Sequence, residues 1–356
     1  MRLIKALRHI ISSAGPMWRA SRQGERLFRY YVLQILSDIG FFAFLQEPRT
    51  YGQILAEFGF GDIDYTRSMF EILSSDKDVV LVKEGDFYRA ASENPVPDLE
   101  QLVRKTDRRM QGFILLAESL TQYILARMRQ QPISLSKTFE RDGREFMYKF
   151  DKLLATKLYS GMRAASFAYL KNRDIDWLRG KKLLEIGCGS GRETAEIWLR
   201  FGSDIKITAV DTVASMIELA EQNFETLIKE IDPDHPPVTE ANRPVFKLAS
   251  ATRLPYGDDE FDAAFWMLVL HWTADPRKVI HEAARVVRPG GLIFGLQSLK
   301  PVTDNYLDFM IRSNENCYGF FWPEEYKRWL TESGLEIDLV PYAGLLRASN
   351  RKDGRP

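Results

Sequence analysis

Residues 183–194 restrict the fold of this chain more than any other stretch of its sequence. The residues up to Ile186 form an apolar run, which is typical of a strand buried in a parallel sheet. Gly187, Gly189 and Gly191 follow at alternate positions, and a helical pattern starts directly after them. A strand, a glycine turn and a helix in this order let the backbone approach a ligand and direct free N–H groups toward it.

An acidic residue in the next strand supports a ligand at this turn. Residues 205–210 form a second apolar run, which ends at Asp211, 20 residues beyond Gly191. A carboxylate at the end of the second strand can accept hydrogen bonds from both ribose hydroxyls of an adenosine. The sequence therefore predicts a cofactor that contains adenosine.

Two adenosine cofactors are compatible with this pattern, a dinucleotide and S-adenosylmethionine. The dinucleotide fingerprint needs a small third residue for helix–strand packing, and Arg192 occupies that position here. Glu185, two residues before the first glycine, can attract the cationic methionyl amino group but would repel a diphosphate. These two residues favour S-adenosylmethionine over the nicotinamide cofactor of an oxidoreductase.

With these residues the chain resembles the class I S-adenosylmethionine-dependent methyltransferases. The similarity continues in order through residues 209–223, 254–272 and 275–295, and it covers about residues 178–300. It implies an α/β fold, a Rossmann-like domain with a seven-stranded sheet. The cofactor-binding residues that it implies are Glu185, Gly187, Cys188, Gly189, Gly191, Asp211, Thr212, Met216, Ser250, Ala251, Thr252 and Met267.

One position departs from the pattern of that family. The family often has an Asp before the small residue that lies beside the adenine, whereas this chain has Ser250 before Ala251. A hydroxyl can bond the adenine amino group, but more weakly than a carboxylate does. The departure bears on the affinity for the cofactor and leaves its identity unchanged.

Composition argues against several classes of protein. The chain has 356 residues, enough for two domains, and its formal net charge of +0 gives no general attraction to nucleic acid or to an acidic membrane. Cys188 and Cys317 form neither a disulfide framework nor a zinc pattern. No apolar run reaches the roughly 20 residues that span a bilayer. We therefore expect a cytoplasmic protein without a metal site, a nucleic-acid partner or a membrane span.

The first residues leave two interpretations open. Residues 1–13 are basic and amphipathic, and no acidic residue occurs before Glu25, which is also the pattern of an organellar transit peptide. The alternative is an arm that packs on another subunit. We favour the arm because the helical pattern continues beyond Gly15 and Pro16 without a stretch that resembles a cleavage site.

Residues 1–95 are expected to form a mainly helical domain of the winged-helix type. Two short helices, residues 51–58 and 64–74, precede a hairpin of residues 79–83 and 87–90. This arrangement resembles the dimerisation domain that precedes the catalytic domain in many small-molecule O-methyltransferases. The resemblance implies a homodimer.

A DNA-binding regulator with a ligand-sensing second domain is the alternative for the winged-helix pattern. The second helix would then enter the major groove. It offers Asp64, Arg67 and Glu71, and Asp76 and Lys77 follow it, which is a balanced to acidic set. Binding to phosphates needs clustered Lys and Arg, so the sequence disfavours this function.

Two further segments complete the predicted organisation. Residues 96–176, with long helical stretches at 99–130 and 140–171, are expected to link the domains and cover the substrate, and residues 177–350 to form the methyltransferase domain. Ordinary core packing is the alternative for each candidate substrate residue. These candidates are Tyr148, Tyr159, Met162, Tyr318, Phe321 and Trp322.

The methyl acceptor decides whether a catalytic base is needed. Methyl transfer from a sulfonium is an in-line displacement, and a hydroxyl acceptor benefits from a base, whereas a thioether does not. His271, after a predicted strand of residues 265–270, is the candidate base, with packing near the cofactor as the alternative. We expect methyl transfer to a small molecule at a hydroxyl oxygen, and sulfur, carbon and nitrogen acceptors stay open.

Overall fold

The structure is a computed structural model, and the residues that it describes are 24–75, 79–105, 111–133, 151–152, 154–301 and 305–351. These residues pack into two units. The sheet unit contains the described residues of 151–301 and 320–351, and the helical unit contains those of 24–133 and 305–319. The predicted N-terminal arm and the candidate substrate residue Tyr148 lie outside the described residues.

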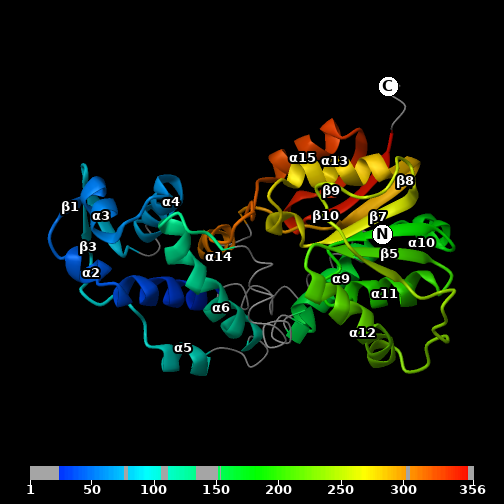
Figure 1. Ribbon diagram of the computed structural model, residues 1–356, viewed down its shortest axis with the longest axis horizontal. Helices are drawn as coiled ribbons and strands as arrows, with labels where there is room; N and C mark the ends of the chain where they lie inside the picture. The colour runs from blue at the N-terminus through cyan, green and yellow to red at the C-terminus, as the bar shows by residue number, and fades with distance from the viewer. Residues whose placement is uncertain are drawn as a thin grey trace. The chain divides into compact units, whose positions relative to one another are not determined.

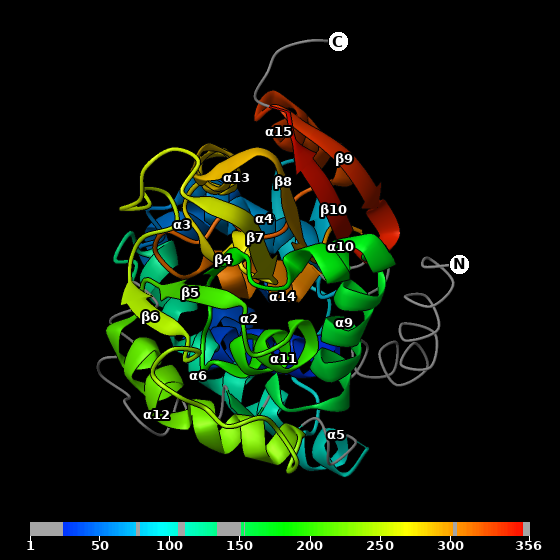
Figure 2. The ribbon, with the colours of Figure 1, turned by 90° about the vertical axis from the view of Figure 1, so that its right-hand side faces the viewer.

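The sheet unit (Figure 1) is built on one seven-stranded sheet with the strand order β6-β5-β4-β7-β8-β10-β9. All seven strands are labelled in Figure 2. The five strands from β6 to β8 run parallel, and β10 is antiparallel to both of its neighbours. This is the predicted Rossmann-like arrangement. The strands are β4 (Lys182–Ile186), β5 (Lys206–Asp211), β6 (Val245–Leu248), β7 (Phe261–Met267), β8 (Val287–Leu296), β9 (Leu335–Val340) and β10 (Leu345–Asn350).

Helices cover both faces of this sheet, as Figure 2 shows. Neighbouring residues in the central strands point to opposite faces, so Leu183 packs with one helical layer and Leu184 with the other. Both layers are therefore needed to bury strands that are apolar on both sides. One layer holds α9 (Lys157–Ala168), α10 (Asn172–Leu178), α11 (Arg192–Phe201) and α12 (Ala214–Ile231), and the other holds α13 (Pro276–Val286) and α15 (Pro323–Glu332).

The end of β7 differs from the prediction. The strand spans Phe261–Met267, and Leu268 adopts a left-handed conformation with φ of 57°, which ends the ladder before residue 270. The chain then turns into a 3-10 helix, η2 (Leu270–Trp272), that contains His271. The apolar pattern continued to Leu270 because that residue is also buried, although it lies outside the strand.

The helical unit contains a three-stranded antiparallel sheet of order β1-β3-β2. Its two predicted short helices and its predicted hairpin are confirmed as elements, while the winged-helix assignment stays a prediction. The elements are β1 (Arg49–Thr50), β2 (Leu81–Glu84), β3 (Phe87–Ala90), α2 (Phe41–Phe44), α3 (Tyr51–Phe58), α4 (Ile63–Leu73), α5 (Leu99–Lys105), α6 (Gln111–Met128) and α14 (Asn305–Arg312).

The aromatic segment after β8 is divided between the two units. The Tyr65 hydroxyl of α4 donates to the Phe309 carbonyl of α14 at 2.9 Å, and the two rings stack at 4.4 Å. Phe320 and the residues after it belong to the sheet unit.

The helix predicted at 140–171 is wrong in part, because residues 155–156 interrupt it and α9 begins at Lys157.

Candidate functional site

The glycine turn after β4 is fixed by left-handed backbone conformations and by hydrogen bonds to β5. Gly187, Gly189 and Gly191 have φ values of 74°, 51° and 87°, which glycine adopts at little cost. The N–H groups of Gly187 and Cys188 both donate to the Val210 carbonyl, at 2.8 and 3.0 Å. The turn is therefore held directly beside the end of β5.

Two of these glycines also leave no space for a side chain. A Cβ on Gly187 would lie 2.5 Å from Cγ2 of Val269, and one on Gly191 would lie 3.1 Å from Cβ of Ala220. Gly187 thus permits close contact with the turn after β7, and Gly191 permits close packing of α11 on α12. The turn is positioned from two sides.

Asp211 lies against the glycine turn, as the sequence predicted. Its Oδ2 accepts a hydrogen bond from the Gly189 N–H at 3.0 Å, and its Oδ1 accepts one from the Val213 N–H at 3.0 Å. Burial raises the pKa of the Asp211 carboxyl, while these backbone donors act in the opposite direction. The two parts of the predicted adenosine site are therefore adjacent.

Glu185 carries a buried acceptor that the described residues leave unsatisfied. Its Oε2 accepts a hydrogen bond from the Thr194 hydroxyl at 2.6 Å, whereas Oε1 has no partner among the described residues. The side chain is only 1% exposed, and burial raises the pKa of its carboxyl to about 8. A buried polar atom without a partner is costly. A cationic donor such as the methionyl ammonium of S-adenosylmethionine would satisfy it, so these residues fit the predicted cofactor.

The predicted adenine segment follows β6 at the same edge of the sheet. The Ala249 N–H donates to the Asp211 carbonyl at 2.9 Å, which places this segment beside the end of β5. Ser250 is exposed, and its hydroxyl lies 2.9 Å from that of Thr252. Ser250, Ala251 and Thr252 are thus grouped next to the predicted ribose acceptor.

The other predicted cofactor residues differ in exposure. Thr212 is exposed, while Met216 and Met267 are buried. Cys188 is fully buried in the core, and burial raises the pKa of its thiol well above the usual range. Cys188 therefore fills the core beneath the turn with a small side chain, and cofactor contacts by Cys188 and by the other three residues stay predictions.

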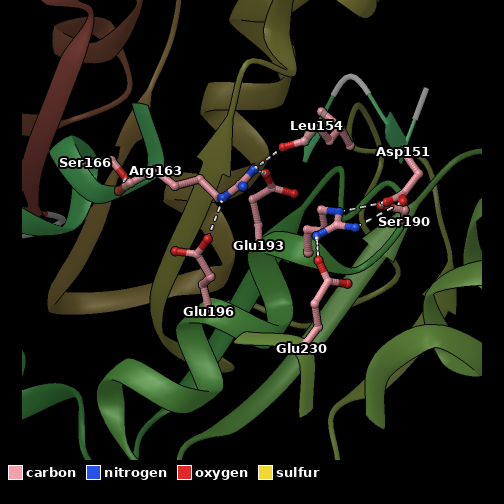
Figure 3. Close-up of polar contacts among 9 residues, drawn as sticks. Asp151, Leu154, Arg163, Ser166, Ser190, Glu193, Glu196 and Glu230 are labelled. Atoms are coloured by element: carbon pink, nitrogen blue, oxygen red, sulfur yellow. Dashed lines mark hydrogen bonds and ion pairs between the residues drawn. The ribbon is translucent and has the colours of Figure 1, made fainter. Parts of the chain in front are cut away.

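A clasp that sequence reasoning missed joins Asp151 to the glycine turn (Figure 3). The Asp151 carboxylate accepts hydrogen bonds from the Ser190 hydroxyl at 2.7 Å and from Nε and Nη2 of Arg192 at 2.9 and 3.2 Å. Arg192, the residue that breaks the dinucleotide fingerprint, thus has a structural role. No local signal reveals this contact, because the partners lie about 40 residues apart in sequence.

A second arginine reinforces the same region from α9. Arg163 is buried and pairs with Glu193 at 2.9 Å and with Glu196 at 2.8 Å. Its Nη1 also donates to the Leu154 carbonyl at 3.1 Å, so it connects the residues before α9 with the start of α11 (Figure 3). The buried guanidinium of Arg163 and the buried carboxylate of Glu193 thus neutralise each other, which a stable interior requires.

His271 lies in η2, two residues after the valine that contacts Gly187. The ring is 5% exposed, and its Nδ1 is 2.9 Å from Nε2 of Gln297. Its centroid is 4.7 Å from that of Phe320. Burial lowers the pKa of His271 to about 3. Gln297 was missed by sequence reasoning because it lies 26 residues away and belongs to no motif.

The described candidate substrate residues differ in exposure and in the unit to which they belong. Phe321 is 1% exposed and packs on Tyr326 and Trp329 in the core of the sheet unit, and a role toward a substrate stays a prediction. Trp322 is 49% exposed at the start of α15. Tyr318 is exposed and belongs to the helical unit.

Tyr159 and Met162 of α9 are partly buried against the core of the sheet unit. Their role toward a substrate stays a prediction.

Within the described ranges, no group of three or more His, Cys, Asp and Glu side chains is placed to hold a metal ion. No helix of the described part of the chain has the length and apolar character needed to cross a bilayer.

Comparison with known proteins links the sheet unit to methyltransferases. Residues 184–295 match the methyltransferase domain family. The chain is 35% identical to 27-O-demethylrifamycin SV methyltransferase of Amycolatopsis mediterranei (strain S699) over 161 residues, which are 44% of this chain and 54% of that protein. It is 26% identical to demethylmenaquinone methyltransferase of Bacillus mycoides (strain KBAB4) over 45% of this chain and 65% of that protein. The chain spans about half the length of the first of these relatives.

Solved structures extend the likeness of fold to almost the whole chain. The CurJ carbon methyltransferase matches with a TM-score of 0.70 and 15% identity over 98% of this chain and 100% of that chain. The CMeT domain of the citrinin polyketide synthase matches with a TM-score of 0.65 and 13% identity over 98% and 96%. At sequence identities this low, the structural similarity establishes a shared fold and does not extend to activity or substrate.

Proposed function

We propose that this chain, whose sheet unit is a class I S-adenosylmethionine-dependent methyltransferase domain, transfers a methyl group from S-adenosylmethionine to a small molecule. The observation that carries the proposal is the 3.0 Å hydrogen bond from the Gly189 N–H to Asp211 Oδ2. This bond brings the glycine turn and the ribose acceptor of the family pattern to one place. The family match over residues 184–295 supports the same function.

Each part of the site has a separate role in this proposal. Glu185 binds the methionyl ammonium through its unsatisfied oxygen, and the Asp211 carboxylate accepts hydrogen bonds from the ribose hydroxyls. Ser250, Ala251 and Thr252 contact the adenine. The bound cofactor supplies an electrophilic methyl carbon on a sulfonium. The chain must then hold the acceptor atom in line with that carbon and exclude water, which is the main contribution of such an enzyme.

The acceptor atom that we propose first is a hydroxyl oxygen. It is supported by the name of the rifamycin relative, 27-O-demethylrifamycin SV methyltransferase, which is 35% identical over the aligned residues. A carbon acceptor is the second candidate, supported by the carbon methyltransferase with which the chain shares its fold over 98% of its length. A homodimer is part of the same proposal, and light scattering of the full chain tests it.

Calorimetric titration with S-adenosylhomocysteine tests the cofactor site. We expect the full chain to bind this product and Asp211→Ala to bind it about tenfold or more weakly, because a hydrogen bond to a charged group contributes about 1.5–3 kcal/mol. Asp234→Asn, a change at an exposed acid in the loop after α12, is the matched control and should bind normally. Absence of binding by the unchanged chain at millimolar ligand would end the proposal.

Transfer itself is tested with the labelled methyl group of S-adenosylmethionine. The chain is incubated with fractionated small-molecule extract, and the labelled product is identified by mass spectrometry. An O-methyl or C-methyl product decides between the two acceptors. Binding of the cofactor without any labelled product would leave a cofactor-binding protein and reject the enzymatic function.

A further inference from the structure

Gln297 is held in place at the end of β8 by its own backbone. The residue is fully buried, and its N–H donates to the Gly344 carbonyl at 3.0 Å. Gly344 has φ of 63°, and a Cβ there would lie 1.7 Å from the Gln297 carbonyl oxygen. The chain is packed so closely at this point that the Gln297 side chain starts from a fixed position.

The Gln297 amide has three polar neighbours, and two of them determine its orientation. Its Oε1 accepts a hydrogen bond from the Leu270 N–H at 3.1 Å, and its Nε2 donates to the Ser298 carbonyl at 3.2 Å. A backbone N–H can only donate and a carbonyl can only accept, so the amide cannot be flipped. The second hydrogen of Nε2 is therefore left for Nδ1 of His271, 2.9 Å away.

This arrangement determines the protonation of the His271 ring. An Nδ1 that accepts a hydrogen bond has no proton, so the neutral ring carries its hydrogen on Nε2. A second proton on Nδ1 would face the Gln297 amide hydrogen and lose that bond. Burial acts in the same direction on the pKa of the ring, and no charged side chain contributes to the shift. The ring thus has no free nitrogen that could take a proton from an acceptor.

The remaining N–H of the ring is available to a ligand. Nε2 has no hydrogen-bond partner among the residues that the structure describes. The groups that pack on the ring are Phe320 and Trp272, with centroids at 4.7 and 5.2 Å, and neither carries a charge. The ring therefore presents one neutral donor, close to the turn that contacts Gly187 through Val269.

We propose that Gln297 is a positioning residue that holds His271 as a neutral hydrogen-bond donor, and that the Nε2–H of His271 binds an anionic oxygen of the methyl acceptor. This inference rests on the proposed function and deepens it. Because the ring takes up no proton, the acceptor must lose its proton to solvent before transfer. The substrate class is therefore an acidic acceptor, either a phenol or a carbon acid between carbonyl groups.

The step balances without a base on the enzyme. The acceptor anion donates an electron pair from its oxygen or its carbon to the methyl carbon, and the carbon–sulfur bond breaks with its electron pair left on sulfur. The products are the methylated acceptor and neutral S-adenosylhomocysteine thioether. The His271 donor holds the anionic oxygen during this displacement and keeps its own proton.

Nitrogen NMR of the full chain tests the tautomer without any activity. The chain has four histidines, so ring signals are few, and the signal lost in His271→Gln identifies the relevant ring. We expect a neutral ring protonated at Nε2 from pH 5 to 8. Gln297→Glu replaces the amide donor by a carboxylate, which should move the proton to Nδ1 and raise the pKa of the ring. A wild-type ring that is protonated at Nδ1, or that titrates between pH 5 and 8, would overturn the proposal.

Kinetics with the acceptor found in the extract screen test the role of the donor. We expect Gln297→Glu to lower kcat about tenfold or more with a smaller change in KM, and to add an ionisation near neutral pH that the wild-type profile lacks. His281→Gln, at an exposed histidine on α13, is the control and should leave both constants unchanged. An unchanged kcat in Gln297→Glu would reject the donor role. Failure of S-adenosylhomocysteine to bind would instead reject the proposed function, while the NMR result would still stand.

Discussion

The two ends of the proposed site, which lie at the carboxyl ends of neighbouring strands in one sheet, are built from different groups. At the glycine-turn end, between β4 and β5, backbone N–H groups bind the Asp211 carboxylate. At the histidine end, between β7 and β8, a side-chain amide binds an imidazole ring. The first end depends on chain conformation, and the second depends on side chains that are distant in sequence.

The two ends also differ in charge. The glycine-turn end holds Glu185 and Asp211, and burial raises the pKa of both carboxyls. The histidine end holds a ring whose pKa burial lowers and an amide whose hydrogen bonds are complete. The glycine-turn end therefore gains stability from a cationic, donor-rich ligand, whereas the histidine end has its hydrogen bonds made and offers one neutral donor. Binding at the two ends should therefore respond differently to pH and to substitution.

The largest effect is expected at the contact between the two ends. Gly187→Ala places a Cβ 2.5 Å from Val269 Cγ2 at a residue with φ of 74°. Left-handed backbone and overpacking together should destabilise the fold by about 2–5 kcal/mol. Binding of S-adenosylhomocysteine should weaken about a hundredfold or more. The shifted backbone costs several kcal/mol of free energy, which is more than one contact with the ligand contributes. Chemical denaturation and calorimetry measure the two quantities.

Gly189→Ala is the matched control for this change. Its φ of 51° is also left-handed, but an added Cβ would meet only Leu154 Cδ1 at 3.8 Å. We expect a loss of stability of about 1–2 kcal/mol, from the backbone alone. Combining Gly187→Ala with Val269→Ala should recover part of the loss, since the clash is with that side chain. Equal losses in both glycine variants, without recovery, would show that the two ends do not depend on each other.

The next effect concerns pH and separates the two ends by charge. Because the pKa of Glu185 is raised to about 8, the ligand-free protein loses stability as pH rises from about 4.5 toward 8, where the unfolded chain has already released this proton. A bound ammonium favours the ionised carboxylate. Affinity for S-adenosylhomocysteine should therefore rise with pH below 8, by up to about tenfold per pH unit, while the ligand keeps its ammonium.

Calorimetry in buffers of different ionisation enthalpy measures the proton released on binding. Glu185→Gln should remove this release and flatten the dependence on pH, because the amide does not titrate. The change keeps a partner for the Thr194 hydroxyl, which donates to Oε2 of Glu185 at 2.6 Å. A pH dependence that persists in Glu185→Gln would assign the titration to another group and remove Glu185 from the ammonium site.

The same contrast explains what could be predicted from the sequence. Glu185, the three glycines and Asp211 all lie within residues 185–211, and strand–turn–helix order alone brings them together. The seven-stranded sheet was implied by the resemblance to the class I methyltransferases, and the structure contains it. The end of β7 was placed too late, because residues 268–270 are apolar although Leu268 leaves the strand through a positive φ.

Contacts between distant side chains could not be predicted. Gln297 is an ordinary polar residue in the sequence, and its role depends on Leu270 N–H and Ser298 carbonyl positions that only the folded turn defines. Asp151 likewise meets Arg192 across 41 residues. Phe321 shares its aromatic character with pocket residues, so only its burial assigns it to the core. Residue type alone does not specify partners that tertiary packing brings together.

A smaller effect is expected at the clasp behind the glycine-turn end. Asp151→Asn keeps the size of the side chain but removes the charge that pairs with Arg192 at 2.9 Å. Arg192 is then left with Glu230 at 3.4 Å, and we expect a loss of about 1–2 kcal/mol in the free energy of unfolding. Hydrogen exchange of the Gly189 and Ser190 amides should increase with it.

Glu230→Gln is the control for the clasp. The Glu230 side chain is 58% exposed, so its pairing with Arg192 should contribute less than about 0.5 kcal/mol. The histidine end should show no change in exchange in either variant. Equal effects of Asp151→Asn and Glu230→Gln would show that the clasp is only a surface ion pair and that the glycine turn is stable without it.

The smallest effect is expected at Ser250, where the chain departs from the family pattern. Its hydroxyl lies 2.9 Å from the Thr252 hydroxyl, which could donate to a carboxylate placed at residue 250 and orient it. Ser250→Asp should therefore tighten binding of S-adenosylhomocysteine about two- to fivefold, since a charged acceptor binds the adenine amino group more strongly. Ser250→Ala should weaken binding by about twofold at most, because at this exposed position a water molecule can replace the hydroxyl as hydrogen-bond partner. Calorimetry at one pH compares the three proteins. Weaker binding by Ser250→Asp would mean that the negative charge already gathered by Glu185 and Asp211 limits this end, and that the serine avoids a third acid there.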